Sequence, residues 1–113
     1  LNERHADSSL IEPSSYSHKV NVEVTTLDAL VDEYNLDKIK LLKVEAEGFE
    51  PEIIEGSKMS LKKVEYIALD GGYERGTEGR ETFSEICNVL LQNNFKLVET
   101  NWNTHRALFK QNL

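Results

Sequence analysis

The pattern of apolar and polar positions predicts strands and helices that alternate along most of the chain. Residues 20–24 alternate apolar and polar side chains, as in a strand with one buried face. Residues 27–34 repeat apolar side chains at helical spacing, and Thr25 or Thr26 can cap the start of such a helix. Residues 39–46 begin apolar on both faces, which favours a central parallel strand covered by helices. The first part of the chain therefore predicts a strand, a helix and a second strand.

The second part of the chain continues this alternation and ends in a hairpin. Gly48 permits a sharp turn. A short helix is expected after this turn, and Gly56 is its natural stop. Residues 64–70 again carry apolar side chains on both faces, which predicts a third strand. A helix and two strands are expected last, over residues 83–90, 95–100 and 106–110. This order predicts an α/β fold with a mostly parallel sheet and a C-terminal antiparallel hairpin.

The beginning of the chain lacks such a pattern. Residues 1–19 are rich in Ser, His and Asp, and Glu12 followed by Pro13 is typical of a loop. A chain of 113 residues is long enough for one hydrophobic core but not for two. We therefore expect an irregular connector over residues 1–19 and a single α/β unit over residues 20–113.

Composition adds exclusions to this picture. Acidic residues outnumber basic ones by 20 to 13, so the surface repels polyanions, and neither nucleic acid nor a membrane is expected as a partner. No apolar run approaches the roughly 20 residues needed to cross a bilayer, and a cytoplasmic location is expected. Cys87 is the only cysteine, which excludes an intrachain disulfide. The three histidines are too dispersed to predict a metal site.

Charged residues gather where two of the predicted strands end. By alternation, Lys43 and Glu45 share a face near the end of residues 39–46, and Glu47 lies just beyond. Asp70 ends the next predicted strand, and open α/β sheets bind ligands beyond the carboxyl ends of their strands. If the two strands are neighbours, repulsion raises at least one carboxyl pKa unless Lys43 or a cationic ligand compensates. The cluster could act as a general base, orient a hydroxyl or seat a positive group; solvation of charged strand ends is the alternative.

Three blocks of the sequence together resemble the signature of the FkbM methyltransferase family. The blocks are VTTLDAL at residues 24–30, IKLLKVEAEGFE at residues 39–50 and IIEG at residues 53–56. The resemblance extends to residues 8–10, 64–70 and 106–110, and so covers nearly the whole chain from residue 8 onward. Two positions depart from the family pattern. Glu45 stands where the family usually has Asp, and Asp70 stands where it usually has Glu.

The resemblance implies a Rossmann-like, class I methyltransferase that moves a methyl group from S-adenosylmethionine to a hydroxyl. The expected acceptor is a small molecule or a glycan, such as a sugar or a natural product. The implied catalytic residues are Glu45 or Glu47 as the base or hydroxyl orienter. Lys43 would be their charge partner, and Asp70 would shape the crevice.

The parts of the family that bind the cofactor have no counterpart in this sequence. The family's glycine-rich first loop is missing, because Gly71, Gly72 and Gly76 all follow the strand that ends at Asp70. The acidic residue that ends the family's second strand is missing as well. We therefore expect the C-terminal half of a methyltransferase domain, inactive alone and with no cofactor-binding residue assigned. An exposed sheet edge would favour self-association. The alternative is a noncatalytic α/β binding or assembly module built on the same fold.

Overall fold

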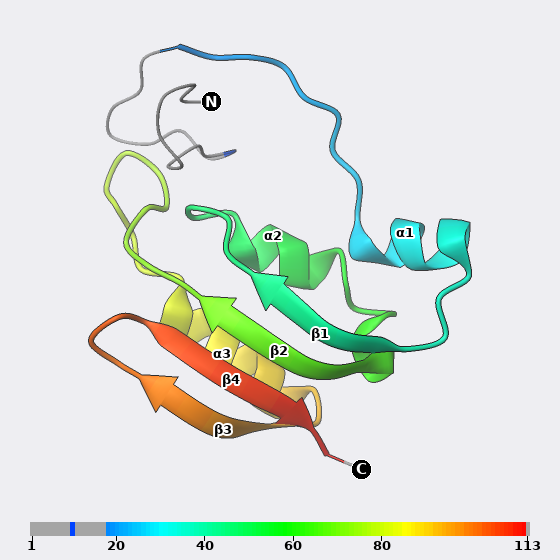
Figure 1. Cartoon of the computed structure of the whole chain (residues 1–113). Coiled ribbons are helices and arrows are strands. Elements are labelled where there is room, and N and C mark those ends of the chain that lie inside the picture. Colours follow the sequence, from blue (N-terminus) through cyan, green and yellow to red (C-terminus); the bar gives the residue numbers. More distant parts are fainter. Residues whose placement is uncertain (1–9, 11–17, 113) are drawn as a thin grey trace.

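One four-stranded sheet runs through the described part of the molecule (Figure 1). The computed structural model describes residue 10 and residues 18–112. Its helices are α1 (Leu27–Tyr34), α2 (Glu50–Glu55), the short 3-10 helix η1 (Leu61–Lys63) and α3 (Phe83–Gln92). Its strands are β1 (Ile39–Val44), β2 (Val64–Asp70), β3 (Phe95–Asn101) and β4 (Arg106–Gln111). None of the described helices combines the length and the hydropathy that a membrane span requires.

The sheet is mixed, so the prediction of a mostly parallel sheet is wrong. Its strands follow the order β1-β2-β4-β3. β1 and β2 pair in parallel, whereas β4 pairs antiparallel with both β2 and β3. The α/β class and the closing hairpin are confirmed. The difference arises because β4 returns from the hairpin to the free edge of β2, and local alternation of strands and helices does not determine which edge a returning strand joins.

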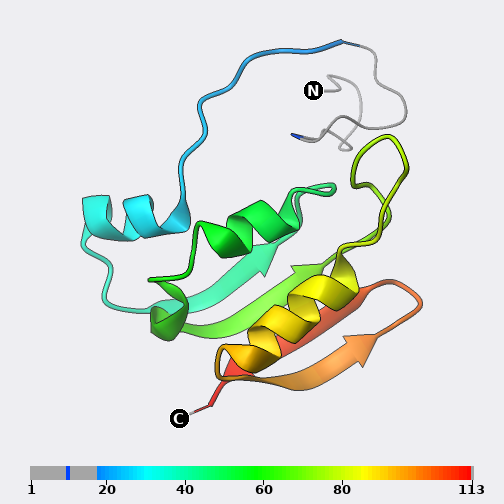
Figure 2. The same cartoon turned by 180° about the vertical axis from the view of Figure 1, so that it is seen from behind.

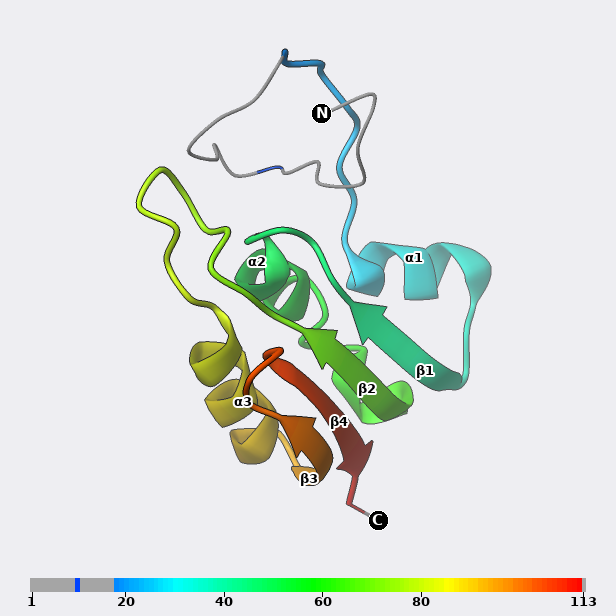
Figure 3. The same cartoon turned by 60° about the vertical axis from the view of Figure 1, so that its left-hand side comes forward.

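The predicted first strand at residues 20–24 is also wrong. This segment belongs to no strand, and its apolar members Val20, Val22 and Val24 are exposed. Figure 3 shows it apart from the sheet, leading into α1. Alternation indicates which side chains could be buried, but a strand forms only where a neighbouring strand completes its backbone hydrogen bonds.

The hydrophobic core lies between the sheet and a layer of helices. Figure 2 shows α2 and α3 in front of one face of the sheet, and Figure 1 shows both helices behind it. The buried side chains of the two inner strands face these helices and include Ile67, Leu69, Ala107 and Phe109. By alternation, the opposite face carries Leu41, Tyr66, Ala68 and Leu108, which are only partly buried or exposed. One face of the sheet is therefore accessible in the described structure.

α1 is anchored to the segment that follows α2. Thr26 caps the helix with its side chain. The Asp28 carboxylate accepts hydrogen bonds from the Met59 and Ser60 amides at 3.1 and 2.8 Å, and another from the Ser60 hydroxyl. The Asp28 amide in turn donates to the Gly56 carbonyl at 3.0 Å. These contacts tie the block at residues 24–30 to Gly56 and to the residues just after it.

Candidate functional site

Two of the predicted site residues lie at the same end of the sheet. β1 and β2 run parallel in a register that places Val44 opposite Leu69. The next position along each strand is Glu45, just after β1, and Asp70, the last residue of β2. The expected placement of both carboxylates at one end of the sheet is therefore found. Their catalytic roles remain predictions.

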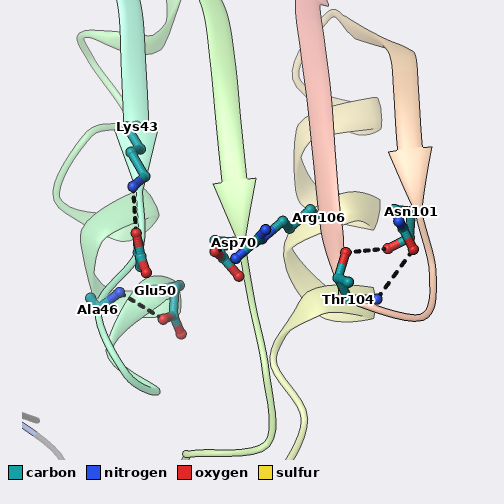
Figure 4. Close-up of polar contacts among 8 residues, drawn as sticks. Lys43, Ala46, Glu50, Asp70, Asn101, Thr104 and Arg106 are labelled. Carbon is teal, nitrogen blue, oxygen red and sulfur yellow. Dashed lines mark hydrogen bonds and ion pairs between the residues drawn. The ribbon is translucent and has the colours of Figure 1, made fainter. Parts of the chain in front are cut away.

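Each of these two carboxylates is paired with a basic side chain. Lys43 Nζ lies 2.5 Å from Glu45 Oε2, while Arg106 Nε donates to Asp70 Oδ2 at 2.9 Å (Figure 4). Arg106 is the first residue of β4, and the antiparallel register places it opposite Asp70. Sequence reasoning did not assign Arg106 to the site. The available signal was its position in the sequence, because an antiparallel strand begins at the end of the sheet where its parallel neighbours finish.

The ion pair with Lys43 determines the direction in which the pKa of Glu45 is shifted. The hydrogen bond and the positive charge of Lys43 lower the pKa of Glu45, with a smaller contribution from Arg106, and they outweigh the opposing effect of burial. The pKa of Lys43 is raised, mainly by its hydrogen bond to Glu45. The sequence left open whether repulsion or Lys43 would prevail, and at Glu45 the compensation by Lys43 prevails. Glu45 is therefore a weak proton acceptor near neutral pH but a good hydrogen-bond acceptor.

A hollow of about 480 Å³ opens on the accessible face of the sheet beside these ion pairs. This volume lies within the range of small-molecule sites, which is about 300–1,000 Å³. The lining of the hollow combines charged and apolar residues, which include Lys43, Glu45, Asp70, Arg106, Ala68 and Leu108. On the hairpin side, the lining residue Asn101 is fixed by the turn, because its side-chain oxygen accepts a hydrogen bond from the Thr104 amide at 3.3 Å (Figure 4).

Glu47 lies outside the lining of this hollow. It occupies the turn after β1 in the left-handed conformation, with φ 51°, and the following Gly48 has φ 100°. Left-handed backbone is uncommon for a residue with a side chain, so this turn needs external support. The structure thus brings three predicted site residues to the hollow and places the fourth in a constrained turn beside it.

The buried side chain of Glu50 supplies part of that support. Glu50 is 1% exposed. Its Oε1 atom accepts a hydrogen bond from the Ala46 amide at 2.9 Å (Figure 4). The same atom accepts one from the Gly48 amide at 3.2 Å, and Oε2 accepts one from the Thr82 hydroxyl at 3.0 Å. Sequence reasoning gave Glu50 no role beyond its place in the family signature. The missing information was three-dimensional, since Thr82 is 32 residues away.

A second support comes from the loop between β2 and α3. Arg75 donates two hydrogen bonds to the Glu52 carboxylate at 2.6 and 2.7 Å, and another to the Gly48 carbonyl at 2.8 Å. The hydrogen bond from Arg75 lowers the pKa of Glu52 despite the effect of burial. Arg75 lies in the charged, glycine-containing loop at residues 73–80. In the structure its side chain is only 20% exposed and fastens this loop to the turn after β1.

Other reactive residue types show no comparable arrangement. Among the described residues, no group of three or more His, Cys, Asp or Glu side chains is placed to hold a metal ion. Cys87 is buried on the inner face of α3, where burial raises its pKa to about 11. Its side chain therefore stays a thiol and contributes to packing.

Lys43→Met is expected to raise the pKa of Glu45 towards its ordinary range. The substitution removes both the hydrogen bond and the charge that lower this pKa most. Because both side chains are largely exposed, solvent screening keeps the expected rise small. An NMR titration of the Glu45 carboxyl carbon measures it. Lys40→Met is the matched control. Lys40 lies on the same strand as Lys43, and its substitution removes a similarly exposed ion pair with Glu65. Equal responses of Glu45 to both substitutions would show that Lys43 has no special effect.

Comparison with known families gives a match over most of the chain. A family model described as the methyltransferase FkbM domain matches residues 1–97. Searches of curated proteins and of solved structures found no match. The matched range includes β1, β2 and α3, and therefore contains Lys43, Glu45 and Asp70 but not Arg106.

Proposed function

The chain belongs to the FkbM methyltransferase family, and on this premise we propose that it forms the acceptor-binding part of an S-adenosylmethionine-dependent O-methyltransferase. The proposed acceptor is a hydroxyl of a sugar or another natural product, as the sequence resemblance implies. The observation that best supports this proposal is the meeting of Lys43, Glu45 and Asp70 on one open hollow. The hollow lies at the carboxyl ends of parallel strands, which is where open α/β sheets bind ligands.

Within this proposal, Glu45 orients the acceptor hydroxyl rather than removing its proton. A general base works best when its pKa lies near the working pH, and Lys43 holds the pKa of Glu45 below its usual range. A carboxylate with a low pKa still accepts a strong hydrogen bond from a hydroxyl group. Asp70, held by Arg106, shapes the lining of the hollow beside Glu45. Glu47 is then the remaining candidate for the base.

The described residues do not by themselves form a site for S-adenosylmethionine. The two glycines directly after β2 offer no cradle, because a Cβ on Gly71 would lie 3.1 Å from Phe83 Cα, and one on Gly72 would lie 2.3 Å from the Glu74 carboxylate. The two carboxylates that could face a positive sulfonium are already in ion pairs. We propose that further strands beside β1 complete the cofactor site. The four strands would then be one half of a Rossmann-like class I sheet, with β1 at its present edge.

Calorimetric titration with S-adenosylmethionine tests this proposal. One titration uses the 113-residue chain, and a second uses a polypeptide that also includes the sequence encoded upstream of residue 1. We expect saturable binding by the longer polypeptide and no binding heat from the chain alone. Binding by neither would contradict the proposed function and favour a noncatalytic binding or assembly module. Binding by the chain alone would contradict the incomplete cofactor site.

A further inference from the structure

Glu50 is the one buried acidic side chain among the described residues. Both of its carboxyl oxygens are engaged by donors within the protein, two from the turn after β1 and one from Thr82. A group this deeply buried and fully engaged cannot touch an acceptor in the hollow. Any effect of Glu50 on the site must therefore act through the residues that it holds.

The hydrogen bonds of Glu50 enclose Glu47. Its Oε1 atom binds the amide on either side of that residue, at Ala46 and at Gly48. Between these two amides, the backbone of Glu47 adopts its left-handed conformation. The two hydrogen bonds thus fix the direction in which the Glu47 side chain leaves the backbone. The third bond, from Thr82, ties this arrangement to the residue that precedes α3.

We propose that Glu50 is a positioning residue that sets the conformation of the turn carrying Glu47 at the end of β1. The importance of this turn for methyl transfer rests on the proposed function, but its conformation does not. The proposal requires the hydrogen-bonding shape of Glu50 and not its ionisable group. Gln retains that shape, because its Oε1 can accept from both amides while its Nε2 donates to Thr82 Oγ1. Ala retains none of it.

Amide hydrogen exchange followed by NMR tests this directly. In Glu50→Ala, exchange at Ala46 and Gly48 should accelerate by about tenfold or more relative to Ala29, because both amides lose a buried acceptor. The Ala29 amide is a suitable internal reference, since its acceptor is the capping Thr26 side chain, outside this turn. In Glu50→Gln, both amides should keep protection close to that of the unsubstituted protein. Unchanged exchange in the Ala variant, or equal acceleration in both variants, would overturn the proposal.

A third variant covers the case in which Glu50→Ala does not fold. Thr82→Val removes a single hydrogen bond to Glu50 at nearly constant side-chain volume. It should weaken protection at Ala46 and Gly48 relative to the unsubstituted protein, and unchanged protection would count against the proposal. In a methyl-transfer assay with the longer polypeptide, Gln should retain kcat, whereas Ala should lower kcat more than it changes KM. If the turn responds as expected but the unsubstituted protein transfers no methyl group, the proposed function fails while the positioning role stands.

Discussion

Gly48→Ala is expected to lower the free energy of unfolding by about 2–5 kcal/mol, because it combines backbone strain with a clash. Gly48 has φ 100°, a conformation that side chains rarely allow. A Cβ at this position would lie 2.8 Å from Arg75 Cα and 2.9 Å from the Glu74 carbonyl oxygen. These are backbone atoms, which cannot turn aside as a flexible side chain could. The loop that carries Arg75 would have to move away from the turn after β1, and its hydrogen bond to the Gly48 carbonyl would be lost.

Gly76→Ala is the matched control for this prediction. Gly76 also has a left-handed φ, of 73°, but a Cβ there would meet nothing within 4 Å. The control therefore isolates the conformational penalty, of about 1 kcal/mol. Urea denaturation of both variants gives the two free energies of unfolding. Equal losses would show that the close approach of the two loops at Gly48 does not contribute.

Asp28→Ala is expected to lower the free energy of unfolding by about 2–3 kcal/mol, because it leaves two backbone donors without their acceptor. The amides of Met59 and Ser60 both donate to this carboxylate, and Ser60 is buried. Asp32→Ala is the control, since Asp32 is an exposed acidic residue on the same helix. A comparable loss in the control would show that helix α1 tolerates no alanine at acidic positions, rather than that Asp28 anchors it.

The effect of Asp28→Ala should also depend on pH. Burial raises the pKa of Asp28, but the hydrogen bonds from the Ser60 hydroxyl and from the two amides outweigh it and lower the pKa below the ordinary value. A group with a lowered folded-state pKa stabilises the protein fully above its unfolded pKa, which is about 4 for Asp. This contribution is lost as the pH falls through the folded-state pKa. The difference between the unsubstituted protein and Asp28→Ala should therefore narrow in acid, and a constant difference from pH 7 to pH 3 would contradict the linkage.

Local periodicity was sufficient to locate most of the strands and helices. Residues 64–70 carry apolar side chains on both faces and form the inner strand β2, and the helix predicted over residues 83–90 is found as α3. Residues 20–24 have a strand pattern but no neighbouring strand, so pattern alone misled. The relative directions of the strands in the sheet were mispredicted for a similar reason. Where β4 inserts depends on tertiary packing between distant segments, which no local window contains.

Only the part of the candidate site that lies at predicted strand ends could be found from the sequence. Glu45 and Asp70 could be placed together because parallel neighbours end at one edge. Arg106 enters the site only through the antiparallel pairing of β4 with β2, and Glu50 only through contacts that burial creates. Sequence reasoning therefore found the residues that the strands deliver to the edge. It missed the residues that hold those strand ends in place.

The central place of β4 has a consequence for how the protein is made. β4 follows the other three described strands in the sequence, yet it lies between β2 and β3. During synthesis β1 and β2 can associate early, whereas β3 must wait for β4, its sole partner in the described sheet. A ribosome that stops before residues 106–111 therefore releases a chain in which β2 presents an unpaired edge to other nascent chains. Messages that stop before the codons of β4 should then yield insoluble product rather than a shortened domain.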